Sequence, residues 1–208
     1  MGLLDSPRLY LLAQDLLGAR RARRRWLESY AAIRPGQRVL DIGCGPGFVA
    51  TYLQDVQYVG TDINKGYIDY AMRHHGHLGE FHCCLIDNTT ASHFGCFDRV
   101  LLAGVLHHID DAGTDQLFRA LTSSLRPGGQ IITLDGYRHD SMSFISRWLI
   151  DHDRGRFVRG RSGYERLAAP HFKTVRCFYR DDLFRFPYDA CIMTCQYDPA
   201  PESLANQP

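Results

Sequence analysis

Three glycines at alternate positions follow a short apolar run near residue 40, and this feature constrains the fold more than any other. The segment reads Val39-Leu40-Asp41-Ile42-Gly43-Cys44-Gly45-Pro46-Gly47. Its apolar run predicts a buried strand, and glycines at a strand-to-helix turn let the backbone approach a ligand closely. Ligands of open α/β sheets bind beyond the carboxyl ends of the strands, so the segment predicts a binding site there.

Short apolar runs alternate with longer helical segments along the rest of the chain. The runs are 38–42, 58–62, 81–87, 98–103, 130–135, 174–179 and 190–195, and the helix candidates are 47–54, 66–74, 111–125, 141–152 and 162–168. Such alternation requires a parallel sheet covered on both faces. The last two runs are joined by too few residues for a parallel crossover. We therefore predict an α/β, Rossmann-like three-layer sandwich whose seven-stranded sheet is mostly parallel, with the last strand antiparallel.

The composition excludes several classes of protein. Lys and Arg number 24 and Asp and Glu number 23, so the net charge of +1 argues against nucleic acid as a partner. Seven cysteines without a C-x-x-C pair suit a reducing compartment, and we expect a cytoplasmic location. The apolar run 9–17 contains Asp15 and is shorter than the roughly 20 residues of a membrane span, so no membrane association is expected.

An acid at the end of the next run extends the glycine pattern. Asp62 follows Gly43 by 19 residues, where a carboxylate can accept hydrogen bonds from both hydroxyls of a ribose. A dinucleotide fingerprint, G-x-G-x-x-G, would need a glycine where this chain has Phe48. Asp41, directly before the glycines, disfavours a pyrophosphate and suits a ligand that carries an ammonium group.

Four segments in order resemble the class I S-adenosylmethionine-dependent methyltransferases, in particular their small single-domain members. They are residues 39–47, 58–63, 97–109 and 125–130. The resemblance implies a Rossmann-like fold and S-adenosylmethionine as the cofactor. From the pattern along the whole chain we expect an N-terminal helical segment (1–36), a methyltransferase domain (37–198) and a tail (199–208).

The resemblance also implies a set of cofactor-binding residues. They are Asp41, Gly43, Gly45, Gly47, Asp62, Ile63, Asp87, Leu102 and Ala103. In this assignment the glycines lie against the methionine part of the cofactor, and Asp62 holds its ribose. Ile63 and Asp87, which ends the third predicted strand, contact the adenine, while residues 102–103 supply backbone near the methionine ammonium.

Two histidines follow the fourth predicted strand at the edge of the sheet where a substrate should lie. Methyl transfer from a sulfonium is an in-line displacement, in which the protein supplies alignment, desolvation and, where needed, a base. Imidazole titrates near neutrality, so His108 and His107 are the candidate catalytic bases. Tyr137 and His139, after the fifth predicted strand, are rival candidates.

An aromatic-rich insertion at about 137–172 interrupts the domain. Residues 137–188 hold eleven aromatic side chains, which could build a hydrophobic lid or pocket, although core packing alone accounts for about half of them. Arginines gather in the same insertion, at 154–161, and again at 20–25. Each cluster is either a solvated face, an anchor for the carboxylate or phosphate of a small acid, or a track for RNA.

A group of histidines and cysteines superficially resembles a metal site. Its members are His74, His75, His77, His82, Cys83 and Cys84. Their spacing fits no standard zinc pattern, so we predict no metal.

Taken together, these features predict a methyltransferase that uses S-adenosylmethionine to methylate oxygen or nitrogen of a small molecule, anionic or aromatic. An RNA methyltransferase is the first alternative, suggested by the arginines. A non-catalytic partner subunit that keeps the fold is the second.

Overall fold

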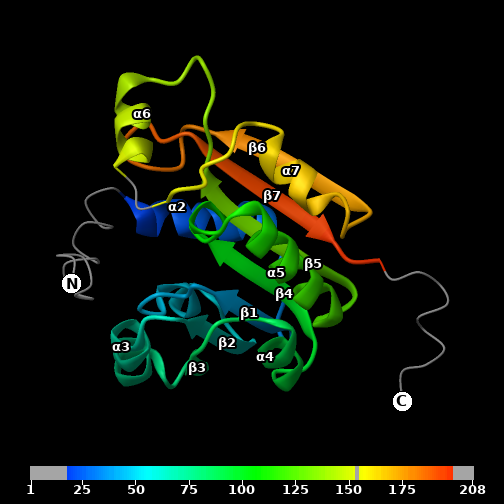
Figure 1. Ribbon diagram of the computed structural model, residues 1–208. Coiled ribbons are helices and arrows are strands. Elements are labelled where there is room, and N and C mark those ends of the chain that lie inside the picture. Colours follow the sequence, from blue (N-terminus) through cyan, green and yellow to red (C-terminus); the bar gives the residue numbers. More distant parts are fainter. Residues whose placement is uncertain (1–17, 153–154, 199–208) are drawn as a thin grey trace.

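A single mixed sheet organises the computed structural model, which describes residues 18–152 and 155–198 (Figure 1). The strands are β1 (Arg38–Ile42), β2 (Gln57–Asp62), β3 (Glu80–Cys83), β4 (Phe97–Ala103), β5 (Leu125–Gly136), β6 (Thr174–Arg180) and β7 (Ala190–Gln196). Their order in the sheet is β3-β2-β1-β4-β5-β7-β6, and β7 runs antiparallel to both of its neighbours. The predicted fold class is therefore confirmed.

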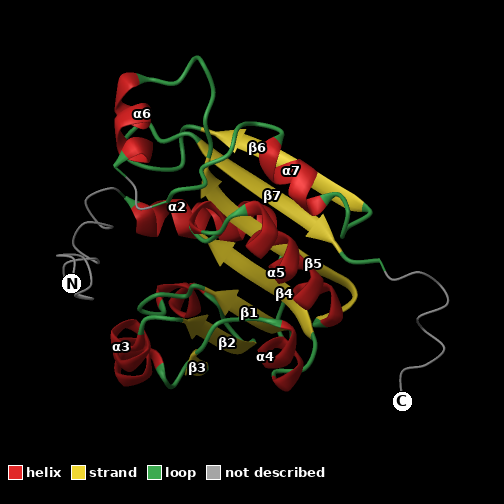
Figure 2. Cartoon of the chain, in the orientation of Figure 1, coloured by secondary structure: helices red, strands yellow, loops and turns green. Residues whose placement is uncertain are grey.

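Helices cover both faces of this sheet (Figure 2). They are α2 (Ala19–Trp26), the π-helix η2 (Leu27–Ala31), the 3-10 helices η3 (Phe48–Tyr52) and η4 (Leu106–His108), α3 (Lys65–His75), α4 (Asn88–His93), α5 (Asp111–Ser123), α6 (Phe144–Asp151) and α7 (Gly163–Ala168). α4, α5 and α7 pack on one face, and α2, η3 and α3 pack on the other. No helix in the described part of the chain is long and apolar enough to cross a membrane.

The central strands are apolar throughout because each of their faces is buried. Successive side chains of a strand point to opposite faces. Val39 and Leu101 accordingly join the core beneath α2 and α3, whereas Leu40 and Leu102 join the core beneath α4 and α5. This arrangement explains why the strands appear in the sequence as continuous apolar runs rather than alternating ones.

The third strand is shorter than its apolar run predicts, and this corrects the placement of Asp87. β3 ends at Cys83, and Asp87 is the N-cap of α4, a helix that the sequence pattern did not predict. Asp87 Oδ1 accepts hydrogen bonds from the backbone nitrogens of Thr89 and Thr90 at 2.9 and 2.8 Å. α4 is polar and buries only Ala91, so it has no apolar periodicity to reveal it.

The helix expected over residues 47–54 is also shorter, a five-residue 3-10 helix. It starts directly after Gly47, whose left-handed φ of +82° takes this residue out of the helix. The N-terminal helical segment begins, in the described structure, with α2. Its residues 1–17 and the predicted tail 199–208 lie outside the described residues.

Trp26 fastens α2 to the centre of the sheet. Its side chain is fully buried, and its indole Nε1 donates a hydrogen bond to the carbonyl oxygen of Thr133 in β5 at 3.1 Å. Both the apolar contact and the satisfied donor are lost when the ring is removed.

We expect Trp26→Ala to lower the free energy of unfolding by about 3–5 kcal/mol, the usual cost of deleting a buried aromatic side chain. Urea unfolding followed by circular dichroism measures this change. Arg24→Ala, on the exposed side of the same helix, is the matched control and should change stability by less than about 0.5 kcal/mol. Equal effects of the two substitutions would contradict the anchoring role of Trp26.

Candidate active site

The glycine loop, residues 43–47, leaves β1 in a conformation that favours glycine at each alternate position. The φ angles of Gly43, Gly45 and Gly47 are +67°, +55° and +82°, all in the left-handed region. A Cβ added to Gly47 would lie 2.8 Å from Phe81 Cε1, and one added to Gly43 would lie 2.7 Å from Val105 Cγ2. The glycines therefore permit both the turn and the close approach of Phe81 in β3 and of Val105 in the segment after β4.

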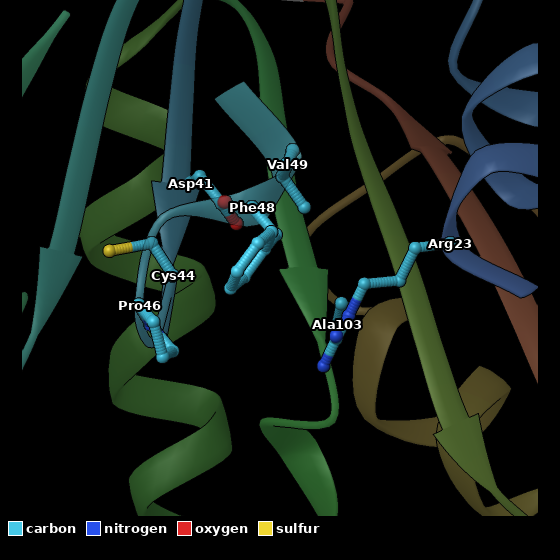
Figure 3. Close-up of a pocket in the computed structure, with 8 residues that line it drawn as sticks. Arg23, Asp41, Cys44, Pro46, Phe48, Val49 and Ala103 are labelled. Carbon is cyan, nitrogen blue, oxygen red and sulfur yellow. The ribbon is translucent and has the colours of Figure 1, made fainter. Parts of the chain in front are cut away.

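A small pocket opens beside this loop (Figure 3). Its lining comes from α2, the end of β1, the glycine loop, η3 and the end of β4: Arg23, Asp41, Gly43, Cys44, Pro46, Phe48, Val49 and Ala103. The pocket thus brings together three of the predicted cofactor residues, Asp41, Gly43 and Ala103. The side chain of Leu102 instead lies in the hydrophobic core.

Asp41 is a buried carboxyl group at the base of the pocket. Its Oδ2 accepts a hydrogen bond from the hydroxyl of Tyr58 at 2.6 Å, and only 1% of the residue is exposed. Burial raises the pKa of Asp41 to about 7, and this effect outweighs the hydrogen bond from Tyr58 and the positive charge of Arg23, which both lower it. A cation that enters the pocket would favour the ionised form.

Asp62 is held against the glycine loop at the end of β2. Its Oδ2 accepts from the backbone nitrogen of Gly45 at 2.9 Å, and its Oδ1 accepts from that of Asn64 at 2.8 Å. Burial raises the pKa of this half-buried carboxyl group, while the backbone donors oppose the rise. Each carboxylate oxygen can accept a second hydrogen bond, so Asp62 retains capacity for two hydroxyl donors. The next residue, Ile63, leaves 74% of its surface exposed.

Arg23 is a site residue that the sequence analysis placed only within an arginine cluster. Its side chain extends from α2 towards Ala103 and lines the pocket with Asp41 (Figure 3). Ala22 and Trp26, which flank this position on the helix, are fully buried. That helical spacing distinguishes Arg23 from Arg20, Arg21 and Arg24, which are exposed, and is the signal that could have identified it.

The two candidate bases differ sharply in their surroundings. His107 is buried, and its Nδ1 lies 2.8 Å from Oδ1 of Asp135, which is also buried. His108 is exposed, and the centroids of the two imidazole rings are 4.2 Å apart. Of the rival candidates, Tyr137 is buried and stacked on His139, with a distance of 4.9 Å between the ring centroids.

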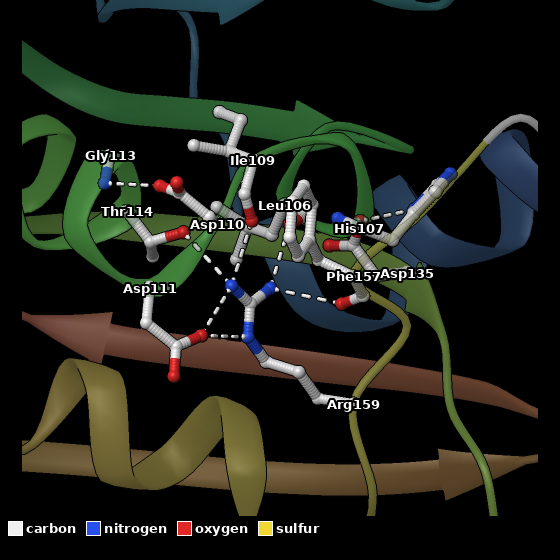
Figure 4. Close-up of polar contacts among 10 residues, drawn as sticks. All are labelled: Leu106, His107, Ile109, Asp110, Asp111, Gly113, Thr114, Asp135, Phe157 and Arg159. Atoms are coloured by element: carbon white, nitrogen blue, oxygen red, sulfur yellow. Dashed lines mark hydrogen bonds and ion pairs between the residues drawn. The ribbon is translucent and has the colours of Figure 1, made fainter.

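Arg159 joins the insertion to the segment after β4 (Figure 4). Its guanidinium donates to the carbonyl oxygens of Leu106 and Ile109 at 2.7 and 2.8 Å and to Asp111 Oδ1 at 2.8 and 3.0 Å. This member of the arginine cluster at 154–161 therefore has a structural role. In the same cluster Arg161 lies over the ring of Tyr179, and position 154 lies outside the described residues.

The remaining predicted residues are not gathered at the pocket. Asp87 caps α4 in an exposed position. Among residues 18–152 and 155–198, no group of three or more His, Cys, Asp or Glu side chains is arranged to hold a metal ion.

The buried carboxyl group of Asp41 predicts a dependence of stability on pH. A folded-state pKa of about 7 means that the folded protein binds a proton which the unfolded chain releases near pH 4. The contribution of Asp41 to stability is therefore fully present below about pH 4 and is lost as the pH rises towards 7. Above that pH the contribution is constant.

We expect Asp41→Asn to gain stability relative to the wild type as the pH rises from 4 to 7, by at most about 1.4 kcal/mol per pH unit. Asparagine keeps an acceptor for Tyr58 but does not titrate. Chemical unfolding of both proteins across this range measures the difference. A difference that does not change with pH would show that Asp41 ionises normally.

Part of the chain is similar in sequence to known proteins. Residues 39–129 match the family of methyltransferase domains. The ubiquinone biosynthesis O-methyltransferase of Chromobacterium violaceum is 26% identical over 150 residues, which cover 70% of this chain and 63% of that protein. The phosphoethanolamine N-methyltransferase of Triticum aestivum is 32% identical over 108 residues, 50% of this chain and 21% of that protein. The chain thus matches less than two thirds of the length of these relatives.

Solved structures share the fold at low sequence identity. A TehB-like S-adenosylmethionine-dependent methyltransferase from Corynebacterium glutamicum has a TM-score of 0.64 and 17% identity, covering 92% of this chain and 98% of that one. The phosphoethanolamine N-methyltransferase 2 of Haemonchus contortus has a TM-score of 0.65 and 18% identity, covering 86% of this chain and 52% of that one. Residues 39–129 thus match a methyltransferase domain in sequence, and the strand order and the glycine loop match the fold of the class I S-adenosylmethionine-dependent methyltransferase superfamily.

Proposed function

We propose that this protein transfers the methyl group of S-adenosylmethionine to an oxygen or nitrogen of a small molecule by in-line displacement. The observation that carries the proposal is the pocket in which Arg23, Asp41 and the glycine loop meet at the carboxyl edge of the sheet. Two of the relatives, a ubiquinone biosynthesis O-methyltransferase and a phosphoethanolamine N-methyltransferase, support a small-molecule acceptor.

The polar groups around the pocket match the charges of the cofactor. The guanidinium of Arg23 complements the carboxylate of its methionine part, and Asp41 complements the ammonium. Asp62 accepts the ribose hydroxyls while the nitrogen of Gly45 holds this carboxylate in place. The exposed side chain of Ile63 provides an apolar surface for the adenine. When bound, S-adenosylmethionine supplies an electrophilic methyl group on a positively charged sulfur.

The other predicted cofactor residues keep their proposed roles. Backbone at Gly47 lets the chain pass close to the ligand, and backbone at residues 102–103 faces the methionine ammonium. Asp87 accepts from the adenine amino group; its two backbone hydrogen bonds fall on Oδ1, and its side chain is exposed.

The candidate bases follow the strand that ends at the pocket. Val105 lies against Gly43, so the segment that leads into η4 is in contact with the glycine loop. His107 and His108 are the second and third residues of that helix. We therefore assign the acceptor site to the space beside η4 and propose one of these imidazoles as the general base.

Several arginines of the two clusters are paired within the protein, which argues against an RNA-binding surface. Arg159 is bound within the protein, Arg24 pairs with Glu28 at 2.8 Å, and Arg25 pairs with Asp182 at 3.2 Å. In the arginine cluster at 20–25, Arg23 lines the pocket, which agrees with an anchor for one small anion.

We expect Arg23→Met to raise the Kd for S-adenosylmethionine about 10- to 100-fold, because a charge-assisted hydrogen bond contributes about 1.5–3 kcal/mol. Calorimetric titration measures the affinity. Arg24→Met removes the same charge from the next position, which is exposed, and should change the Kd by less than about twofold. Wild-type affinity in the Arg23 variant would contradict the assigned role.

The activity itself is tested with methyl-labelled S-adenosylmethionine and a cell extract. We expect label in low-molecular-mass compounds, with transfer abolished in Asp62→Ala because ribose binding is lost. Label that appears only in RNA, or only in protein, would contradict a small-molecule acceptor.

A further inference from the structure

The helix α6 carries three bulky apolar side chains on its exposed surface. It lies beyond the carboxyl end of β5, at one end of the sheet (Figure 1). Phe144, Ile145 and Trp148 leave 82%, 47% and 50% of their surface exposed. Phe144 and Ile145 are both one helical turn from Trp148, so the three side chains share one face of the helix, which we call the apolar face of α6. An exposed face of this kind marks a site that binds a partner.

The opposite face attaches α6 to the rest of the protein. Ser146 and Ile150, four residues apart, are 0% and 1% exposed. Ser146 Oγ accepts a hydrogen bond from the backbone nitrogen of Asp189 at 2.9 Å. The helix therefore buries a serine and exposes its largest apolar side chains, which is the reverse of the usual pattern for a helix on a globular protein. Because the buried serine is bonded to Asp189, the apolar face is held outwards.

Positive charge surrounds the apolar face. Residues 137–161 hold six arginines, three aspartates and no lysine or glutamate, although the net charge of the whole chain is only +1. Arg138 pairs with Asp151 at 2.7 Å, so the acid at the end of α6 is balanced. Arg147 and Arg156 are exposed and form no ion pair with a described residue. A partner of this face must therefore accept apolar side chains and positive charge together.

The interface of a bilayer with anionic lipids meets both requirements. Aromatic side chains of a surface helix lie at the level of the lipid headgroups, and neighbouring arginines are attracted by the negative surface potential. A second copy of the chain fits less well. Two-fold pairing of the apolar face would bring Arg147 of both copies into one small interface, where like charges repel.

We propose that the apolar face of α6 docks the protein on the surface of a bilayer that contains anionic lipids. The run 9–17 is too short to span a membrane, but a helix that lies in the interface needs no span, so this inference replaces the expectation of no membrane association. The backbone nitrogen of Phe157 donates to the carbonyl oxygen of His107 at 2.9 Å, so the segment after α6 adjoins the proposed acceptor site. The docking itself does not depend on the proposed methyl transfer.

Tryptophan fluorescence of the wild-type protein tests the docking without any variant. The chain has two tryptophans, of which Trp26 is fully buried and Trp148 is half exposed, so a change in emission on binding reports on α6. With vesicles of mixed phosphatidylcholine and phosphatidylglycerol, we expect a blue shift and protection from acrylamide quenching. Unchanged emission, or an equal shift with pure phosphatidylcholine, would overturn the proposal. A shift that follows protein concentration without lipid would also overturn it, because a second copy would then cover the face.

Cosedimentation of the full chain with the same mixed vesicles assigns the binding to α6. We expect the partition coefficient to fall at least about tenfold in the double variant Phe144→Ser, Trp148→Ser, and about fivefold in Arg147→Gln. Met72→Ser is the control, because it removes an apolar side chain on α3 that is 56% exposed, and it should change binding less than about twofold.

Circular dichroism checks that the variants are folded, as expected for substitutions of exposed side chains. Wild-type binding by the double variant would overturn the proposal, and so would an equal loss of binding in Met72→Ser. No methyl transfer is measured in either experiment, so the docking and the proposed function fail or stand separately.

Discussion

The turn that follows β1 depends on backbone angles that glycine adopts without strain, and the rest of the site is assembled on this turn. Positive φ at Gly43, Gly45 and Gly47 directs the chain across the end of β2. The nitrogen of Cys44 then donates to the carbonyl oxygen of Thr61 at 3.0 Å, and that of Gly45 donates to Asp62. With Val105 packed on Gly43, the ends of β1, β2 and β4 meet at one place.

The two halves of the proposed site are held by different forces. The cofactor half is built by backbone conformation and by packing of α2, where buried Trp26 carries Arg23 to the pocket. The acceptor half is held by buried polar contacts, the Arg159 guanidinium on the carbonyl oxygens around η4 and the Asp135 carboxylate on His107. Such contacts depend on direction, so they suit a site that must orient a proton acceptor.

The sequence predicted the elements that leave a periodic or local signal. Strands buried on both faces appear as continuous apolar runs, so the sheet could be predicted from the sequence. The glycine loop and Asp62 lie within 20 residues of chain, so the proposed cofactor half of the site could be predicted as well. α4 was missed because its formation depends on the polar cap at Asp87 rather than on an apolar face. Arg23 was missed although the helical spacing of its buried neighbours Ala22 and Trp26 marks it. Asp135 could not be chosen from spacing, because its partner His107 lies 28 residues away and meets it only after folding.

The central claim is that the glycine loop and the neighbouring strand ends hold S-adenosylmethionine. Backbone amide chemical shifts of the ¹⁵N-labelled protein, recorded during titration with S-adenosylhomocysteine, test it most directly. The account predicts saturable changes, at one molecule per chain, concentrated at residues 41–48, 62–63 and 102–105. No change on addition of the ligand, or changes concentrated at the opposite edge of the sheet, would contradict it.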